Sequence, residues 1–298
     1  MLGFASSLRA SCYNSAVDSS LRTVPRCYAF LAGLAICAAG PVACEKSDTR
    51  PTPPVQETHG PVDSIGGAFS CKIDSGHVYC KGVDTYCQLG QGAPGPRLAS
   101  WVELPSISDA RALALGNAHA CALRAAGQVS CWGWNLHGEA KPPRPAVPDP
   151  NVHANDPSLT VGTPLDVGGI SDAVEVAAST SSTCARTASG AVFCWGDSLF
   201  VDADDDGALR QVSVPESIAL AAGDDFVCSI SSDRRVFCWG FVLDTRGDGH
   251  TAHSPSMVLT PGAKEPIKSG RYGVCVGTGS KRRCWGRPPG SVRLTRPR

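Results

Sequence analysis

Residues 116–138 read GNAHACALRAAGQVSCWGWNLHG. Cys121 and Cys131 stand ten positions apart in this stretch, and apolar residues alternate with other residues on both sides of Ala125-Ala126-Gly127. Alternation with period two around a short turn that contains glycine is typical of a β-hairpin. The stretch therefore predicts two antiparallel strands, the second of which carries Cys131-Trp132-Gly133.

The same pattern occurs five times along the chain of 298 residues. The cysteine pairs, nine or ten positions apart, are Cys71/Cys80, Cys121/Cys131, Cys184/Cys194, Cys228/Cys238 and Cys275/Cys284. In four copies the second cysteine opens the tripeptide Cys-Trp-Gly, whereas the first copy reads Cys80-Lys81-Gly82. A unit that recurs at intervals of this length indicates a repeat architecture.

The spacing of each pair also predicts its partner. If the two cysteines of a copy face each other, the residues between them pair up to the tip of the hairpin. A separation of ten positions then leaves a three-residue loop at the tip, and a separation of nine leaves a two-residue loop, which is Ser75-Gly76 in the first copy and Gly279-Ser280 in the fifth. Facing residues of antiparallel strands lie roughly 4.5–5.5 Å apart, which a disulfide can span. We therefore predict five disulfides within the repeats, each worth roughly 2.7 kcal/mol. Zinc is the alternative, but zinc sites use cysteines two to four residues apart.

The repeat resembles that of the regulator of chromosome condensation (RCC1) family, in the cysteine-bearing form of exported bacterial proteins. The second copy resembles it best, and the first has Cys87 where a glycine is usual. The resemblance implies an all-β fold, a β-propeller with four strands per blade. Five blades are recognisable, and a degenerate sixth within residues 140–170 is the alternative to a proline-rich surface loop. Residues 291–294 are expected to supply a strand that closes the ring.

The N-terminal residues predict export. Arg22 and Arg26 precede an apolar stretch at residues 27–43, as in a signal peptide. Val42-Ala43-Cys44 resembles a bacterial lipoprotein signal, with Cys44 acylated after cleavage. We expect an extension and signal at 1–43, a Pro-rich linker at 44–61 and the propeller at 62–298. The expected location is the outer membrane or cell surface of a bacterium, and otherwise the periplasm or the medium.

Two loops invite a functional interpretation. Asp202, Asp204 and Asp206, followed by Gly207, occupy positions of a calcium-binding loop, but Ser213 stands where such loops carry glutamate. A solvated acidic turn is therefore favoured, and calcium is a weak candidate and the sole cofactor considered. Arg246-Gly247-Asp248 is interpreted as a turn. Because the tryptophans of Cys-Trp-Gly recur, they are assigned to packing, and ligand stacking is expected of Trp101 or Trp134 instead.

Composition and motifs limit the function. Lys plus Arg equals Asp plus Glu at 27 each, which does not favour a nucleic-acid partner. The sequence contains no Gly-x-Ser-x-Gly, His-Glu-x-x-His or phosphate-loop motif. We expect a non-catalytic binding or scaffold protein that recognises a protein or glycan through propeller-face loops. It is expected to meet the membrane only through a lipid anchor and to have no small-molecule substrate.

Two other functions are weighed against this one. The resemblance suggests guanine-nucleotide exchange or another regulatory role, which the signal and the paired cysteines disfavour, because a reducing cytosol would leave the thiols unbridged. An exported carbohydrate-active enzyme would require a pair of carboxylates in a pocket.

Overall fold

The computed structural model describes eight stretches of the chain. They are residues 54–58, 60–64, 67–143, 156–197, 207–243, 249–259, 266–270 and 273–286, all of which belong to the compact unit Arg50–Arg298. The predicted signal and Cys44, the acidic residues Asp202, Asp204 and Asp206, the tripeptide Arg246-Gly247-Asp248 and residues 291–294 lie outside the described stretches.

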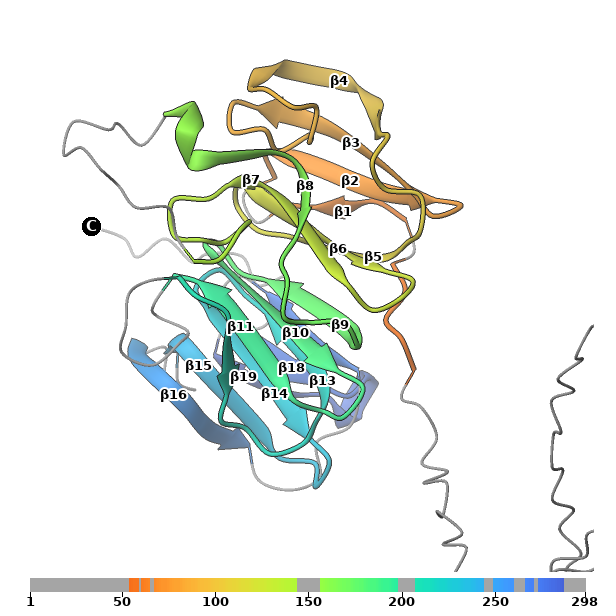
Figure 1. Cartoon of the computed structure of the whole chain (residues 1–298). Helices are drawn as coiled ribbons and strands as arrows, with labels where there is room; N and C mark the ends of the chain where they lie inside the picture. Colours follow the sequence, from red (N-terminus) through yellow and green to blue (C-terminus); the bar gives the residue numbers. More distant parts are fainter. Residues whose placement is uncertain are drawn as a thin grey trace, which may run out of the picture. The chain divides into compact units, whose positions relative to one another are not determined.

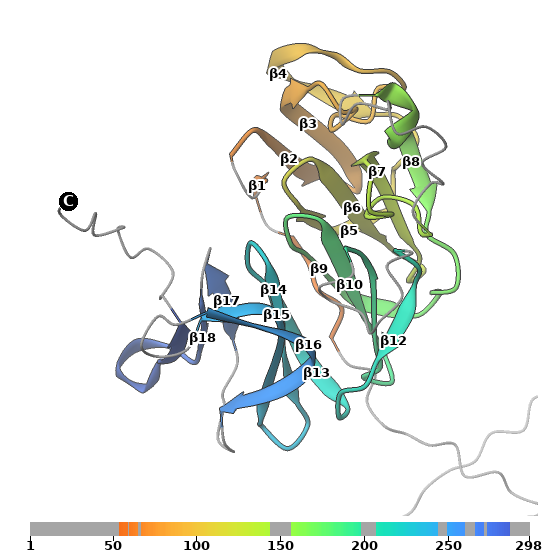
Figure 2. The same cartoon turned by 90° about the vertical axis from the view of Figure 1, so that its left-hand side faces the viewer.

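Within the described stretches, five antiparallel sheets follow one another along the chain (Figures 1 and 2). We call them the first to fifth blades. The first contains β1 (Val62–Asp63), β2 (Phe69–Asp74), β3 (His77–Asp84) and β4 (Gly95–Leu104). The second contains β5 (Ala110–Leu115), β6 (His119–Arg124), β7 (Val129–Trp134) and β8 (Thr160–Asp166), with the 3-10 turn η1 (Pro157–Leu159) before β8.

The third blade contains β9 (Ala173–Ala178), β10 (Ser182–Thr187), β11 (Val192–Gly196) and β12 (Arg210–Val212). The fourth contains β13 (Ser217–Ala222), β14 (Phe226–Ser231), β15 (Val236–Leu243) and β16 (Gly249–Leu259). The fifth is three-stranded in the described residues, with β17 (Ile267–Gly270), β18 (Gly273–Val276) and β19 (Arg283–Gly286). Neighbouring blades contact each other through the strand pairs β2 and β5, β5 and β9, β9 and β13, and β13 and β17, and each of these strands except β2 is the first of its blade.

The hairpin that carries each cysteine pair has the predicted register. In all five blades the two cysteines face each other across the second and third strands, and each pair lies at bonding distance. Ser75 and Gly76 form the two-residue loop with φ of 52° and 86°, which is the turn that matches the twist of a hairpin. The pairing predicted from spacing is therefore confirmed as geometry.

The turn predicted for the fifth blade was wrong. Gly279-Ser280 was expected to join the strands, but pairing ends at Val276 and Arg283. The 3-10 turn η3 (Gly279–Lys281) lies between them. The N–H of Gly277, with φ of 78°, donates to the Pro266 carbonyl and so extends the pairing of β18 with β17, not with β19. The Lys281 N–H then donates to the Thr278 carbonyl, so the connection is longer than a tight turn.

The stretch between the second and third repeats does not form a sixth sheet in its described part. Residues 160–166 are β8, the fourth strand of the second blade, and pair with β7. The long separation between these repeats therefore lies within one blade, between its third and fourth strands. The centre of the proline-rich run, from residue 144 onward, is outside the described residues.

The glycine of Cys-Trp-Gly allows the strand to bend against its neighbour. Gly133 has φ of 98°, and a Cβ atom there would lie 2.5 Å from the carbonyl oxygen of Ala118. The register between β7 and β8 shifts at this point, between Cys131 and Gly133. Only glycine adopts this conformation without strain and permits such a close approach of the backbone.

The tryptophan of Cys-Trp-Gly joins the second and the third blade to the blade before it. Trp132 Nε1 donates to the Gln88 carbonyl of the first blade at 2.8 Å, and Trp195 Nε1 donates to the Glu139 carbonyl of the second at 2.9 Å. Both side chains are fully buried. The loops that would serve Trp239 and Trp285 in the same way contain residues outside the described stretches.

The acceptor loops for Trp132 and Trp195 differ in one informative residue. Gln88 Oε1 accepts from the Tyr86 N–H at 2.7 Å, and Glu139 Oε2 accepts from the His137 N–H at 2.6 Å. Glu139 Oε1 is buried without a hydrogen-bond partner among the described residues. Burial raises the pKa of Glu139 to about 8. At neutral pH Glu139 is therefore a neutral acid in the place that an amide takes in the first blade.

This leads to a prediction on pH and stability. The folded protein holds the Glu139 proton up to about pH 8, whereas the unfolded chain releases it near the ordinary pKa of 4.5. Because the folded pKa is raised, the contribution of Glu139 to stability is complete below about pH 4.5 and is lost as the pH rises toward 8. Glu139→Gln should raise the free energy of unfolding at neutral pH by roughly 3 kcal/mol and make little difference near pH 5.

Urea denaturation at pH 5, 6.5 and 8 measures the effect on the two proteins. Glu103→Gln is the matched control, because Glu103 is an exposed carboxylate. If wild type and Glu139→Gln kept the same difference in stability at all three pH values, Glu139 would be charged in the folded protein and the assignment would be wrong.

The disulfides should also differ in their reactivity. Cys80, Cys131, Cys194 and Cys238 are fully buried, whereas Cys284 in the last described strand is half-buried. Thiol–disulfide exchange requires access of the attacking thiolate to a sulfur atom. Limited reduction of the native protein, followed by alkylation and peptide mass analysis, should label Cys275 and Cys284 first. Equal labelling of all five pairs would contradict this order.

Candidate functional site

One face of the first blade is uncovered where the same face of the later blades is buried. The residues on either side of the first cysteine are Ala120 and Ala122 in the second blade, Thr183 and Ala185 in the third, and Val227 and Ser229 in the fourth. All six are at most 1% exposed, because the cysteine-bearing face of the preceding blade packs there. The first blade has Ser70 and Lys72 at these positions, both half-buried.

The third strand of the first blade shows the same change. Lys81, which is half-buried, stands where the later blades carry the tryptophan of Cys-Trp-Gly, and this tryptophan is fully buried in the second, third and fourth blades. Among the described residues no repeat precedes the first blade for a tryptophan at this position to contact. This signal was present in Cys80-Lys81-Gly82, but the sequence interpretation did not use it.

Aromatic and basic side chains gather on this face. Lys81 Nζ lies 4.5 Å from the ring centroid of Trp101, and Lys72 Nζ lies 5.3 Å from the same ring. Lys72 Nζ also lies 5.5 Å from the ring of Tyr79. These are cation–π distances. We call Lys72, Tyr79, Lys81 and Trp101 the basic–aromatic patch.

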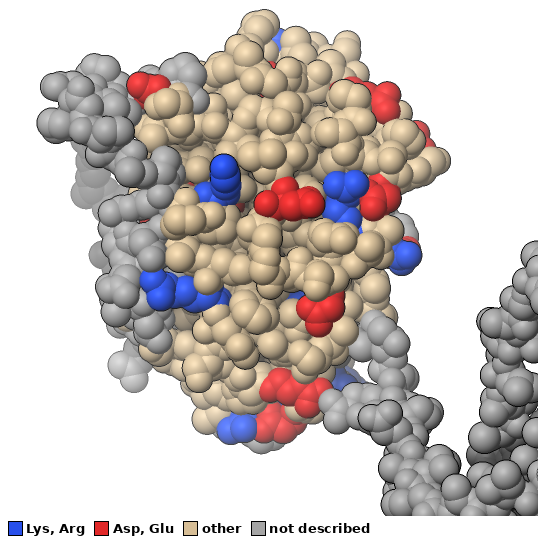
Figure 3. Space-filling view, viewed as in Figure 1, with Lys and Arg blue, Asp and Glu red and all other residues tan. Residues whose placement is uncertain are grey.

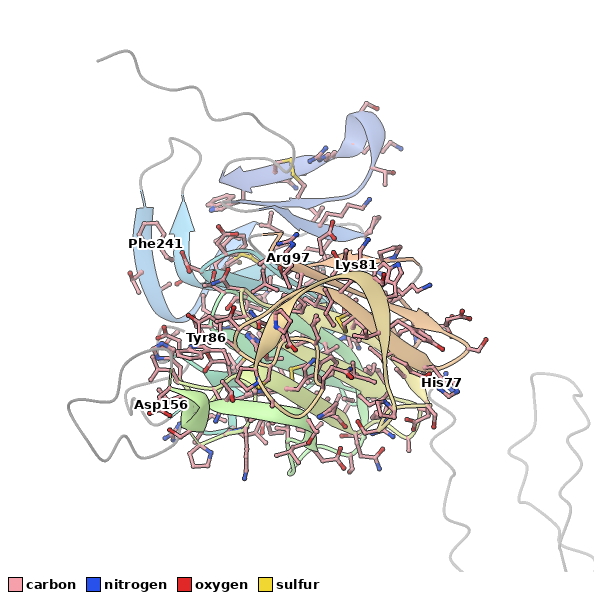
Figure 4. The ribbon with its side chains drawn as sticks, turned by 90° about the horizontal axis from the view of Figure 1, so that it is seen from above. His77, Lys81, Tyr86, Arg97, Asp156 and Phe241 are labelled. Carbon is pink, nitrogen blue, oxygen red and sulfur yellow. A yellow bond between two sulfur atoms is a disulfide. The ribbon has the colours of Figure 1, made fainter. Side chains whose placement is uncertain are left out.

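The patch is bordered by further charges. Figure 4 views the molecule from the side of the first blade, with Lys81 on β3 and the exposed Arg97 on β4 labelled. His77, also labelled, lies 2.9 Å from the carboxylate of Glu103 at one end of these strands. The face viewed in Figure 3 is different, since basic and acidic side chains are interspersed there among uncharged ones. The sequence had named Trp101 as a residue for ligand stacking, and the structure brings it together with two lysines.

Trp134, the other tryptophan expected to stack on a ligand, contacts the protein itself. Its ring lies 4.5 Å from that of Tyr86. The Tyr86 loop is held from within, because the Leu89 N–H donates to the Asp84 carboxylate at 2.9 Å. It is also attached to the second blade, since the Gly92 N–H donates to the Gly162 carbonyl. This loop therefore connects two blades, and the patch is the better candidate for partner binding.

Cys87 occupies a structural position in the same loop. It has φ of 61°, and the corresponding residue of the second blade is Gly138, with φ of 84°. This explains why glycine is usual there. Cys87 is the free cysteine of the described residues and is buried. Its Sγ lies 3.5 Å from Thr160 Oγ1, and burial raises the pKa of the thiol, which opposes thiolate reactivity.

His119, which flanks the second blade in the sequence, is a core residue. Its side chain is fully buried, and Nε2 lies 2.8 Å from Thr183 Oγ1 of the third blade. Burial lowers the pKa of His119 to about 3, so the ring is neutral at physiological pH. A neutral histidine enclosed between two blades has no access to a substrate and serves to join them.

Two kinds of site are not found in the described part of the chain. Within the eight described stretches, no group of three or more His, Cys, Asp or Glu side chains is placed to hold a metal ion. Within the same stretches, no helix has the length and apolar character needed to span a membrane. The weak calcium candidate at Asp202, Asp204 and Asp206 lies outside them and stays untested.

Comparison with known structures places the fold. Human WBSCR16 superposes with a TM-score of 0.60 at 19% identity, over 74% of this chain and 59% of that one. Prp20p from Saccharomyces cerevisiae, described with its binding properties to Gsp1p and histones, gives 0.58 at 21% identity, over 73% of this chain and 55% of that one. Yeast RCC1 (Prp20), solved with Kap60 bound, gives 0.56 at 16% identity, over 74% and 54%. The chain thus spans little more than half the length of these proteins.

Comparison of sequences identifies the repeat. No curated protein matches the chain. The family model of the Regulator of chromosome condensation (RCC1) repeat matches residues 110–139, 173–200 and 218–248. These segments begin at or beside the first strands of three successive blades and extend past their Cys-Trp-Gly tripeptides. The first three strands of the second, third and fourth blades therefore match the RCC1 repeat model, and the chain has the fold of an RCC1-type propeller.

Proposed function

We propose that this protein is a non-catalytic binding protein whose basic–aromatic patch recognises another protein. The observation that carries the proposal is the uncovered face of the first blade, where Trp101 lies beneath Lys72 and Lys81. A face designed only for solvation would need no large aromatic rings. Tyrosine and tryptophan are enriched among the residues that dominate protein–protein binding energy.

The rigidity of the blade supports this role. β2 and β3 are bridged by Cys71 and Cys80, and the opposite face of the blade is buried against the second blade. The side chains of the patch are therefore presented from a fixed surface, which lowers the entropic cost of binding. The charge of the two lysines selects an acidic partner surface, in which a carboxylate lies beside an apolar or aromatic side chain.

Related folds support the choice of a protein as the partner. The yeast protein Prp20p is described as binding Gsp1p and histones, and yeast RCC1 (Prp20) is seen with Kap60. These partners belong to those proteins, and the likeness to this chain is one of fold. What is carried over is the class of function, the binding of proteins by a propeller. A glycan partner is the competing outcome, because sugars also stack on exposed tryptophan rings.

The patch can be tested by mutation. Trp101→Ala and Lys81→Glu should each weaken binding of a specific protein partner, isolated from extract of the source cells, by about tenfold or more, as expected for a central aromatic residue and a paired charge. Met257→Ala is the matched control, because Met257 is 52% exposed on the fourth blade. Dissociation constants from calorimetry at two salt concentrations measure the effect.

Binding that is unchanged by Trp101→Ala and Lys81→Glu would exclude the patch as the partner site. Binding of purified glycans that is lost in Trp101→Ala, without any effect on a protein partner, would assign the patch to carbohydrate recognition instead.

We further propose that the protein acts outside the cytoplasm, tethered by a lipid on Cys44. Two features support export, namely the signal-like residues 27–43 and the five cysteine pairs at bonding distance. Disulfides persist in oxidising compartments and are rare in the cytosol. A location outside the cytoplasm would make the binding partner an extracellular or periplasmic protein.

Intact mass analysis of the native protein tests whether it is exported and lipidated on Cys44. We expect a chain that begins at Cys44, carries acyl groups and fractionates with membranes. Ten of its cysteines should resist alkylation until a reductant is added. Cys44→Ala should release the protein to the soluble fraction without changing the five disulfides. A full-length chain whose cysteines all react before reduction would refute both export and lipidation.

A further inference from the structure

A short N-terminal segment crosses the first strands of two blades and binds both in the same way. We call residues 54–58 the N-terminal strap. The Thr58 N–H donates to the Arg111 carbonyl on β5 at 2.9 Å, and the Gln56 N–H donates to the Val174 carbonyl on β9 at 2.7 Å. Figure 2 shows the strap running beside β9 on its way to β1.

The side chains of the strap complete the contact. Thr58 Oγ1 accepts from the Leu113 N–H at 2.8 Å, and Gln56 Oε1 accepts from the Val176 N–H at 2.9 Å. On each blade the strap thus satisfies one carbonyl and the N–H two residues later. Thr58 bonds to the second blade and Gln56, two residues earlier, bonds to the third. Contacts at every second residue are the periodicity of an extended chain.

The carbonyls that receive the strap are equivalent in the repeat. Arg111 and Val174 each lie three residues before the alanine that faces the first cysteine. Each is the extra residue at a register shift between the first and second strands. A bulge of this kind leaves the extra residue outside the ladder, so its carbonyl is available to a chain from outside the sheet. Ile218 on β13 is the same residue of the fourth blade, by register and by bulge.

The fourth blade has half of this arrangement already filled. The N–H two residues after Ile218 is that of Leu220, and it donates to Glu175 Oε1 of the third blade at 3.1 Å. Glu175 is held in place by Arg186, whose Nε lies 2.7 Å from Oε2, and both side chains are nearly buried. The carbonyl of Ile218 receives no hydrogen bond from outside its own sheet among the described residues.

A pocket of about 480 Å³ lies at this place. Its lining joins the start of the strap to the first strands of the fourth and fifth blades, and includes Val55, Gln56, Glu175, Arg186, Ile218 and Ile267. The charges of Glu175 and Arg186 compensate each other. Val55, Ile218 and Ile267 add apolar side chains to the lining beside its polar backbone groups, so the pocket suits an uncharged segment that carries an apolar side chain.

We propose that this pocket binds an extended, apolar peptide segment of another protein, one of whose backbone N–H groups donates to the Ile218 carbonyl. The segment would continue the path of the strap over the fourth and fifth blades and place an apolar side chain against Val55, Ile218 and Ile267. Addition of an extended chain to an exposed sheet edge is a general mode of peptide recognition. The proposal rests on the proposed function only in that both concern protein binding, since the pocket and the basic–aromatic patch share no residue.

The chain's own sequence disfavours itself as the occupant. The two-residue spacing of the strap puts Pro54 in register with the fourth blade, and proline has no N–H to donate. Pro51 and Pro53 lack one as well. These three prolines therefore cannot give the fourth blade the donor that Thr58 and Gln56 supply to the second and third blades.

Peptide selection tests the proposal. A phage-displayed library of random heptapeptides is selected on the full-length protein, and the best synthetic peptide, with blocked termini, is measured by fluorescence anisotropy. We expect an apolar peptide that binds in the micromolar range. Methylation of its backbone nitrogens one at a time should weaken binding about tenfold at one position, the loss expected for one hydrogen bond. Equal tolerance at all positions would overturn the proposal, and this experiment requires no variant protein.

Variants locate the site. Ile218→Asp and Ile267→Asp, both at half-buried positions, should weaken the peptide about tenfold or more by placing a charge in an apolar pocket. Met257→Asp is the matched control on the exposed surface, and Trp101→Ala should leave the peptide affinity unchanged. Full affinity in both pocket variants would overturn the proposal.

Three outcomes separate this proposal from the proposed function. A peptide that depends on Trp101 but not on Ile218 or Ile267 would refute the pocket and support the patch. A peptide that binds only after residues 51–53 are deleted would show that the chain's own segment fills the pocket, and would also refute the proposal. A partner that is lost in Trp101→Ala, together with a library that yields no binder, would leave the proposed function in place and reject the pocket.

Discussion

The contact between the tryptophan of one blade and a loop carbonyl of the preceding blade is the interaction on which the arrangement of the repeats depends. Trp132 and Trp195 are the largest buried side chains of their blades, and each donates its indole N–H to a carbonyl of the preceding blade. A buried indole N–H without an acceptor would cost more than the bond contributes. The acceptor loop must therefore keep its shape, which explains the buried side chains of Gln88 and Glu139 and the left-handed conformation of Cys87 and Gly138. The buried polar side chains of these loops thus serve to join blades.

Because this contact has a direction, the two ends of the series of blades are not equivalent. Each blade offers its disulfide face to the next and its tryptophan face to the one before. The first blade has no predecessor among the described residues, so its corresponding face is free to carry Lys72, Lys81 and Trp101. The fifth blade has no described successor, and its Cys284 is only half-buried. The candidate binding surface is therefore a result of the packing rule and of the position of one repeat in the chain.

Much of this fold follows from the sequence, because the decisive information is local. The separation of Cys121 from Cys131 determines which residues face each other, and Ser75-Gly76 determines the turn. The turn of the fifth repeat is where the local rule fails, since pairing ends at Val276 and Arg283. The patch was half visible, since Trp101 was singled out but Lys81 was passed over as an exception to Cys-Trp-Gly. The strap and its pocket were beyond prediction, because Gln56 and Val174 are far apart in the chain and their contact depends on a bulge that no local pattern reveals.

The direction of the tryptophan contact also has a consequence for the order in which the protein can form. A ribosome releases the chain from its N-terminus, so the loop that contains Gln88 is made before Trp132, and the loop that contains Glu139 before Trp195. The second and third blades can therefore each pack on a preceding blade whose residues have already been synthesised. The strap is the exception, since residues 56 and 58 are made first but their partners Val174 and Arg111 come much later. The strap can therefore bind only after the second and third blades have formed, and it then links blades that are already packed together.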